Sequence, residues 1–151
     1  IGNQIEANTD LVRRIADEGH TLGNHSMSHP HFERLSLDEQ LEEVDRTDRL
    51  LSSIDGRSRH SFRPPRGVLS VPMLVRFLRQ GRRVDYWSYD SLDYSHRPAA
   101  ELIEVMRRHP LSAGDIILMH DDSPISLEIL RTLIPAWKAE GFSLRALPRE
   151  S

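Results

Sequence analysis

The sequence contains no cysteine, and aromatic residues make up only 6% of its 151 positions. The absence of cysteine excludes disulfide bonds, thiolate nucleophiles and cysteine-based zinc sites, but it leaves the cellular compartment open. The longest purely apolar stretches, such as residues 116–119, fall far below the roughly 20 residues that cross a bilayer. The sequence therefore predicts no membrane span.

The charge distribution shows no excess of basic residues. Lys and Arg number 20 against 23 Asp and Glu, which gives a net charge of −3, and both signs are scattered along the chain. Nucleic acids and anionic membranes bind concentrated basic patches, so we expect no nucleic-acid partner. The length and the hydrophobic content of 38% suit one globular domain, residues 1–151.

Helix start and stop signals divide the chain into alternating elements. Ser36 and Glu39 form a capping box, Ser70 is a second N-cap, and Gly56 and Gly81 follow predicted helix ends. The apolar periodicity predicts helices over about 9–19, 37–53, 71–81, 98–109 and 126–140, with Pro135 bending the last one or marking a boundary. Short strands are predicted over 20–24, 60–63, 84–89, 115–119 and 142–147, the fourth buried on both faces.

Helices that alternate with strands predict a parallel α/β sheet, closed as a barrel or left open. A complete eight-stranded barrel takes ~250 residues. We therefore expect these residues to form part of a barrel or a smaller relative. The chain begins at Ile1 without an initiator Met, and we interpret it as an N-terminally truncated domain.

The side chains with the most reactive chemistry lie directly after predicted strands. They are His25 and His29 after the first strand, Arg63 at the end of the second, Asp90 and Asp93 after the third, and His120, Asp121 and Asp122 after the fourth. The carboxyl ends of parallel strands meet at one edge of a sheet, where ligands bind. We therefore expect these side chains to meet at one site.

The spacing of His25 and His29 allows both imidazoles to share one face of a helical turn and bind a single cation. Imidazole suits zinc and other transition metals better than Mg or Ca. The same spacing also occurs in ordinary polar loops. A catalytic metal site needs a third ligand, which one of the four aspartates or a residue upstream of Ile1 could supply.

Four motifs, in this order, resemble those of the polysaccharide deacetylase family, also called the NodB-homology or carbohydrate esterase 4 family. Residues 23–30 resemble its zinc-binding H-[ST]-x-x-H motif, residues 62–67 its R-P-P-x-G motif, residues 90–94 its D-S-x-D-W motif and residues 117–120 its L-x-H motif. The resemblance covers residues 1–147. It implies an α/β fold, a partial (β/α) barrel of the deacetylase type whose N-terminal strand is missing.

The family's T-F-D-D-G strand, which carries its general base and third metal ligand, has no counterpart in this sequence. We therefore expect the chain alone to be a poor enzyme. The resemblance implies removal of acetyl groups from an N- or O-acetylated polysaccharide such as chitin oligomers, peptidoglycan or an exopolysaccharide, in the cell envelope or outside the cell. The alternative is a non-catalytic glycan- or metal-binding remnant of the family.

The resemblance also implies a role for each matched residue. His25 and His29 would bind zinc or another divalent metal, His120 would be the general acid that protonates the leaving amine, and Asp93 would stabilise its imidazolium form. Arg63 would orient the base, and the backbone N–H of Arg66 would help to hold the oxyanion. The substrate would contact Pro65, Trp87, Leu118 and Tyr94, the last in place of the family's Trp.

Overall fold

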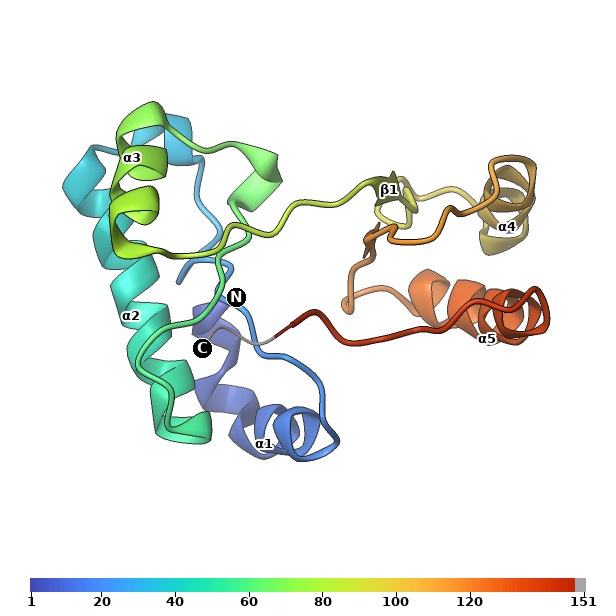
Figure 1. Ribbon diagram of the computed structural model, residues 1–151, viewed down its shortest axis with the longest axis horizontal. Coiled ribbons are helices and arrows are strands. Elements are labelled where there is room, and N and C mark those ends of the chain that lie inside the picture. Colours follow the sequence, from blue (N-terminus) through green and yellow to red (C-terminus); the bar gives the residue numbers. More distant parts are fainter. Residues whose placement is uncertain (149–151) are drawn as a thin grey trace. The chain divides into compact units, whose positions relative to one another are not determined.

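The computed structural model describes residues 1–148, which form two compact units. One unit comprises Ile1–Tyr86 with residues 146–148, and the other comprises Trp87–Arg145. Both contain parallel β-pairing and helices, so the predicted helix-rich α/β class is confirmed (Figure 1). No helix among residues 1–148 is both long and apolar enough to cross a membrane.

The helices of the first unit begin and end close to the predicted positions. They are α1 (Thr9–Asp17), α2 (Leu37–Asp55) and α3 (Val71–Gln80), with short 3₁₀ turns at Gly2–Gln4, Glu6–Asn8, Phe32–Arg34 and Pro65–Gly67. Ser36 and Glu39 form the predicted capping box, and the Ser70 hydroxyl accepts the Met73 N–H. Gly56 and Gly81 end their helices with φ of 74° and 64°, a conformation that glycine adopts without steric cost.

Three extended segments of the first unit run parallel around Phe62, which forms a bridge with Asn24 on one side and with Val84 on the other. The predicted strands at 20–24 and 60–63 are therefore shorter than expected. Phe62 is fully buried and packs in a cluster with Phe32, Val44, Met73 and Phe77. This cluster fixes the extended segments against α2 and α3.

The second unit contains β1 (Tyr89–Asp90), α4 (Ala99–Arg108), β2 (Ile117–Leu118) and α5 (Pro124–Ala139). The two strands are parallel, with Tyr89 opposite Ile117 and Asp90 opposite Leu118. Helices α4 and α5 pack side by side (Figure 1). Their buried contact surface consists of Ala99, Leu102, Ile103, Met106, Ile129, Leu133 and Trp137.

Two expectations for the second unit were wrong, and the boundary offered as one alternative at Pro135 is absent. Residues 115–119 are half-buried rather than buried on both faces. No strand forms over 142–147. An alternation of apolar and polar residues is not enough, because a strand also needs another backbone segment that pairs with it. Helix α5 continues through Pro135, which is exposed, while Leu133 and Trp137 on either side are buried and anchor the helix.

We predict that Ser36→Ala lowers the free energy of unfolding by about 1 kcal/mol, since the variant loses the side-chain acceptor for the Glu39 N–H. Urea denaturation measures the loss. Ser53→Ala is the matched control, because Ser53 lies exposed in the same helix and bonds only the Leu50 carbonyl. Equal losses in the two variants would contradict a capping role.

Candidate active site

The parallel pairing in the first unit brings His25 and Arg63 to neighbouring positions. The Arg63 N–H donates to the Asn24 carbonyl at 2.9 Å, and the Asp85 N–H donates to the Phe62 carbonyl at 2.8 Å. His25, Arg63 and Asp85 therefore each follow a paired residue at the carboxyl end of its segment. This placement agrees with the prediction for the first two residues.

The imidazoles of His25 and His29 lie edge to face, with their centroids 4.9 Å apart. The Nδ1–H of His25 donates to the Arg63 carbonyl at 2.6 Å, which fixes the ring and leaves Nε2 as the nitrogen available to a metal. Burial lowers the pKa of His25 to about 4, against the opposing effect of this hydrogen bond. The ring is therefore neutral at neutral pH, as metal ligation requires.

These two imidazoles fit one transition-metal ion as two of its ligands. Two histidine nitrogens that bind the same zinc ion each lie about 2.0–2.1 Å from it, so the two rings have to be in close contact. The rings of His25 and His29 meet this requirement. Within residues 1–148, however, no group of three His, Cys, Asp or Glu side chains is placed to hold a metal. The described residues thus supply two ligands but not a third.

The R-P-P-R-G segment turns sharply after Arg63. The Arg63 Nε–H donates to the Asp85 carbonyl at 3.3 Å, and burial lowers the pKa of Arg63 while nearby Asp85 opposes that change. Pro65 is buried, whereas Arg66 is exposed. Arg66 has a left-handed backbone, with φ of 56°, and Gly67 follows with φ of 70°. The assigned roles of Arg63, Pro65 and Arg66 remain predictions.

In the second unit, Asp93 and His120 form a hydrogen-bonded pair as predicted. The His120 ring donates from Nδ1 to Asp93 Oδ1 at 2.8 Å, and the His120 backbone N–H donates to Asp93 Oδ2 at 2.7 Å. The Ser126 hydroxyl donates to the same Oδ2 at 2.6 Å. Burial alone would raise the pKa of Asp93, but the hydrogen bonds from Ser126 and His120 outweigh it and lower the pKa.

An aromatic side chain lies beside this pair, and two further predicted substrate contacts belong to the same unit. The Tyr94 ring lies edge-on to the His120 ring at 5.3 Å between centroids, and its hydroxyl donates to Asp90 Oδ2 at 3.3 Å. Half of the Tyr94 surface is exposed, which leaves one face of the ring available to a ligand. Leu118 and Trp87 are half-buried in the same unit. Their contacts with substrate remain predictions.

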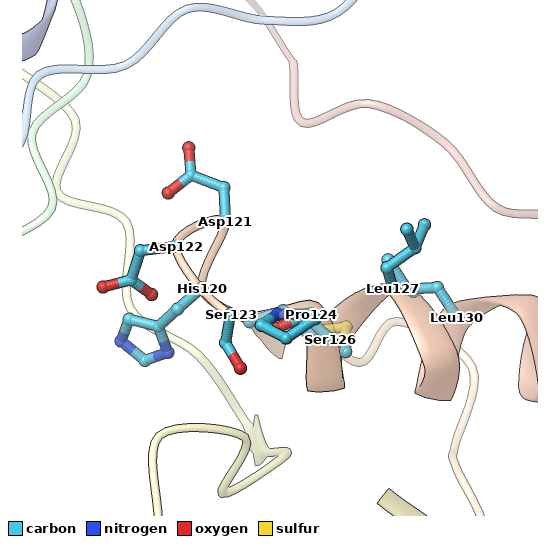
Figure 2. Close-up of a pocket in the computed structure, with 9 residues that line it drawn as sticks. His120, Asp121, Asp122, Ser123, Pro124, Ser126, Leu127 and Leu130 are labelled. Carbon is cyan, nitrogen blue, oxygen red and sulfur yellow. The ribbon is translucent and has the colours of Figure 1, made fainter.

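A pocket of about 540 Å³ opens beside His120. Its lining is polar at one end and apolar at the other, and comprises Met119, His120, Asp121, Asp122, Ser123, Pro124, Ser126, Leu127 and Leu130. Figure 2 shows the carboxylate of Asp122 on the same side of the loop as the His120 ring and that of Asp121 pointing away, with Leu127 and Leu130 farther along α5. The pocket could therefore hold a ligand with both polar and apolar groups.

Sequence reasoning missed three residues that hold these side chains in place. Ser126 carries no motif signal, since a serine in a first helical turn is common. Asn24 precedes His25 and was quoted only as part of the motif. Asp48 did have a signal, because it follows Leu41 and Val44 on the apolar stripe of α2, where a charged residue is unusual.

Comparison with known proteins identifies the family. The family profile described as polysaccharide deacetylase matches residues 1–84. The chain belongs to the polysaccharide deacetylase family. It is 30% identical to a chitooligosaccharide deacetylase of Rhizobium leguminosarum bv. trifolii, covering 99% of this chain and 75% of that protein. It is 32% identical to a peptidoglycan-N-acetylglucosamine deacetylase of Bacillus cereus, covering 100% of this chain but only 59% of that protein.

Solved structures of family members share the fold. A crystallised peptidoglycan N-acetylglucosamine deacetylase superposes with a TM-score of 0.91 at 28% identity, over 98% of this chain and 71% of that one. A family pseudoenzyme from Bacillus anthracis superposes with a TM-score of 0.83 at 25% identity, over 94% of this chain and 50% of that one. The predicted family and its α/β fold are therefore confirmed.

We predict that the His25 ring of the metal-free protein titrates with a midpoint near pH 4 in NMR spectra. The folded-state pKa lies below the ordinary histidine pKa of about 6.5. The contribution of the neutral His25 ring to folding stability is therefore complete above about pH 6.5. It decreases as the pH falls toward 4. His25→Gln should remove this part of the pH dependence in urea denaturation, and a midpoint near 6.5 would contradict the buried, neutral ring.

We predict that Asp93→Asn destabilises the protein at pH 7 by on the order of 2–3 kcal/mol, since an amide cannot accept all three hydrogen bonds. Folding lowers the pKa of Asp93, so the contribution of its carboxylate to folding stability is complete above the ordinary pKa of an aspartate. The difference from wild type should therefore shrink as the pH falls through the folded-state value. Asp122→Asn, an exposed change in the adjacent loop, should show neither effect.

Proposed function

We propose that the protein removes acetyl groups from glycans that contain N-acetylglucosamine, such as chitin oligosaccharides or peptidoglycan, by metal-dependent hydrolysis. The pairing of buried Asp93 with the His120 ring carries the proposal, because it orients an acid–base side chain beside an open pocket. Membership of the family and the names of the similar proteins support the substrate class. We propose that the reaction takes place in the cell envelope or outside the cell.

Hydrolysis of an acetamide adds water to the carbonyl carbon, breaks the carbon–nitrogen bond and leaves acetate and an amine. The departing nitrogen needs a proton, and His120 would supply it from Nε2, since Nδ1 is engaged by Asp93. Asp93 stays ionised because its pKa is lowered, so it favours the charged ring before the transfer. The family's base belongs to a T-F-D-D-G strand that this sequence does not contain.

His25 and His29 would hold the metal, which we propose to be zinc or another divalent transition metal. When bound, such an ion polarises the acetyl carbonyl and lowers the pKa of a water molecule. The Arg66 N–H would donate to the developing oxyanion, and Arg63 would orient the base. Pro65, Trp87, Tyr94 and Leu118 would contact the sugar and the acetyl methyl group.

A second candidate function is non-catalytic binding of a glycan or a metal. It is favoured by the lack of a third metal ligand within residues 1–148 and by the similarity to a family pseudoenzyme. The two candidates differ in what the gene encodes upstream of the Ile1 codon. An Asp-Asp pair on a predicted strand would support the enzyme, and a start codon without such a pair would support the binding protein.

We predict that the gene's full-length product releases acetate from acetylated chito-oligomers or peptidoglycan fragments only when a divalent transition metal is present. His120→Ala should reduce turnover ~10²- to 10⁴-fold, as expected for loss of a general acid, while metal content is unchanged. A His25→Ala/His29→Ala variant should lose both metal and activity. His109→Ala is the control, because His109 is exposed and contacts Tyr89 through its backbone carbonyl.

Activity in the metal-free protein, or equal turnover in the His120 and His109 variants, would overturn the proposed mechanism. Zinc binding without acetate release from either glycan would favour the non-catalytic alternative.

A further inference from the structure

The turn that carries His25 and His29 has an unusual backbone. Ser26 and His29 adopt left-handed conformations, with φ of 64° and 56°. Residues other than glycine rarely adopt this conformation, and they keep it only where surrounding contacts impose it. The geometry of the His25–His29 pair therefore depends on contacts around the turn.

Hydrogen bonds from buried groups hold this turn. The Ser26 N–H donates to the side-chain Oδ1 of Asn24 at 3.0 Å, and the His29 N–H donates to the Ser26 hydroxyl at 3.0 Å. Asn24 and Ser26 are both completely buried, so both acceptors are removed from water. The position of His29 relative to His25 thus follows from the orientation of the Asn24 amide.

Helix α2 sets that orientation. The Nδ2 of Asn24 donates to the Val44 carbonyl and to Asp48 Oδ1, both at 2.8 Å. Because both partners accept hydrogen bonds only, the amide nitrogen has to face them, and its oxygen then faces the Ser26 N–H. Asp48 is itself buried, with 6% of its surface exposed.

The Asp48 carboxylate is fixed by two basic groups. Arg82 donates from Nη2 to Asp48 Oδ2, and its guanidinium also lies over the Phe77 ring. His60 Nδ1 lies 3.5 Å from Asp48 Oδ1, and His60 Nε2 is bonded to Asp55. Burial would raise the pKa of Asp48, but the nearby His60 ring and the hydrogen bonds from Arg82 and Asn24 outweigh it and lower the pKa. The carboxylate therefore remains an acceptor for Asn24.

We propose that Asp48 is a positioning residue for the His25–His29 pair and acts through Asn24 and Ser26. As a statement about metal binding, this rests on the proposed function. The amide of Asp48→Asn has the size of the carboxylate but only one acceptor oxygen, so either Asn24 or Arg82 loses its partner. When Asn24 loses its partner, the turn loses the hydrogen bond that fixes the orientation of the Asn24 amide.

The test measures zinc affinity of the 151-residue chain by competition with a chromophoric chelator. Asp48→Asn should weaken zinc binding 10- to 100-fold, the range typical when a partner of a metal ligand is removed. Asp45→Asn is the matched control, because Asp45 lies exposed one turn earlier in α2 and undergoes the same chemical change. It should bind zinc as the wild type does.

A second readout needs no metal. In the metal-free protein, NMR signals of the His25 and His29 ring nitrogens should move in Asp48→Asn and stay in place in Asp45→Asn. If the 151-residue chain binds no zinc, these ring signals still test the positioning role, whereas absence of zinc binding by the gene's full-length product would contradict metal binding as part of the proposed function.

Ser26→Ala keeps the proposal testable if Asp48→Asn does not fold, since it breaks the same chain of contacts at the His29 end. It should weaken zinc binding and move the His29 ring signals. If both single variants fold, the double variant Asp48→Asn/Ser26→Ala should lose less zinc-binding free energy than the sum of the losses in the two single variants. A folded Asp48→Asn with wild-type zinc affinity and ring signals would overturn the proposal, as would a Ser26→Ala with both unchanged.

Discussion

A carboxylate that is removed from water has to be paired, because an isolated buried charge costs several kcal/mol. Among residues 1–148, two carboxylates are buried, one in each unit. Asp93 accepts from the His120 ring, the His120 N–H and the Ser126 hydroxyl, and Asp48 accepts from Asn24 and Arg82. Each buried carboxylate therefore needs hydrogen-bond donors in fixed positions. For Asp93 one donor is the predicted acid–base residue His120 itself, and for Asp48 one donor is Asn24, which precedes His25.

The backbone supplies the second part of the arrangement. Parallel pairing places His25 beside Arg63, although 38 residues separate them, and places Asp93 and His120 after the neighbouring strands β1 and β2. Carboxyl ends of parallel strands expose backbone groups and loop side chains at one edge. Paired segments only one or two residues long are enough to set this register, since the flanking helices bury the apolar side chains that hold them.

The His25 ring shows how burial prepares a ligand. Its low pKa keeps the imidazole neutral, and its bond to the Arg63 carbonyl selects the tautomer with an unprotonated Nε2. Both properties suit a metal ligand, and both are present in residues 1–148 even though a third ligand is not. The catalytic and non-catalytic candidates therefore share the same pair of histidines and differ in the carboxylates that would complete the site.

The helices were predictable because their signals are local. The capping box at Ser36, the N-cap at Ser70 and the glycines at 56 and 81 act on backbone groups within one turn, so their sequence positions alone locate the helix ends. The motif residues were also identified from the sequence, through a family resemblance that the comparisons confirm.

The strands, and the contacts that fix the site, depended on residues distant in the sequence. Residues 142–147 have a strand-like pattern but form no backbone ladder with another segment, and the short bridges at Asn24, Phe62 and Val84 exist only because three segments meet. The sequence determined where the helices lie and which side chains carry reactive groups. Tertiary structure alone decided that Asp48 reaches Asn24 and Ser126 reaches Asp93, because a hydrogen bond across 24 or 33 residues forms only when packing brings its two atoms together.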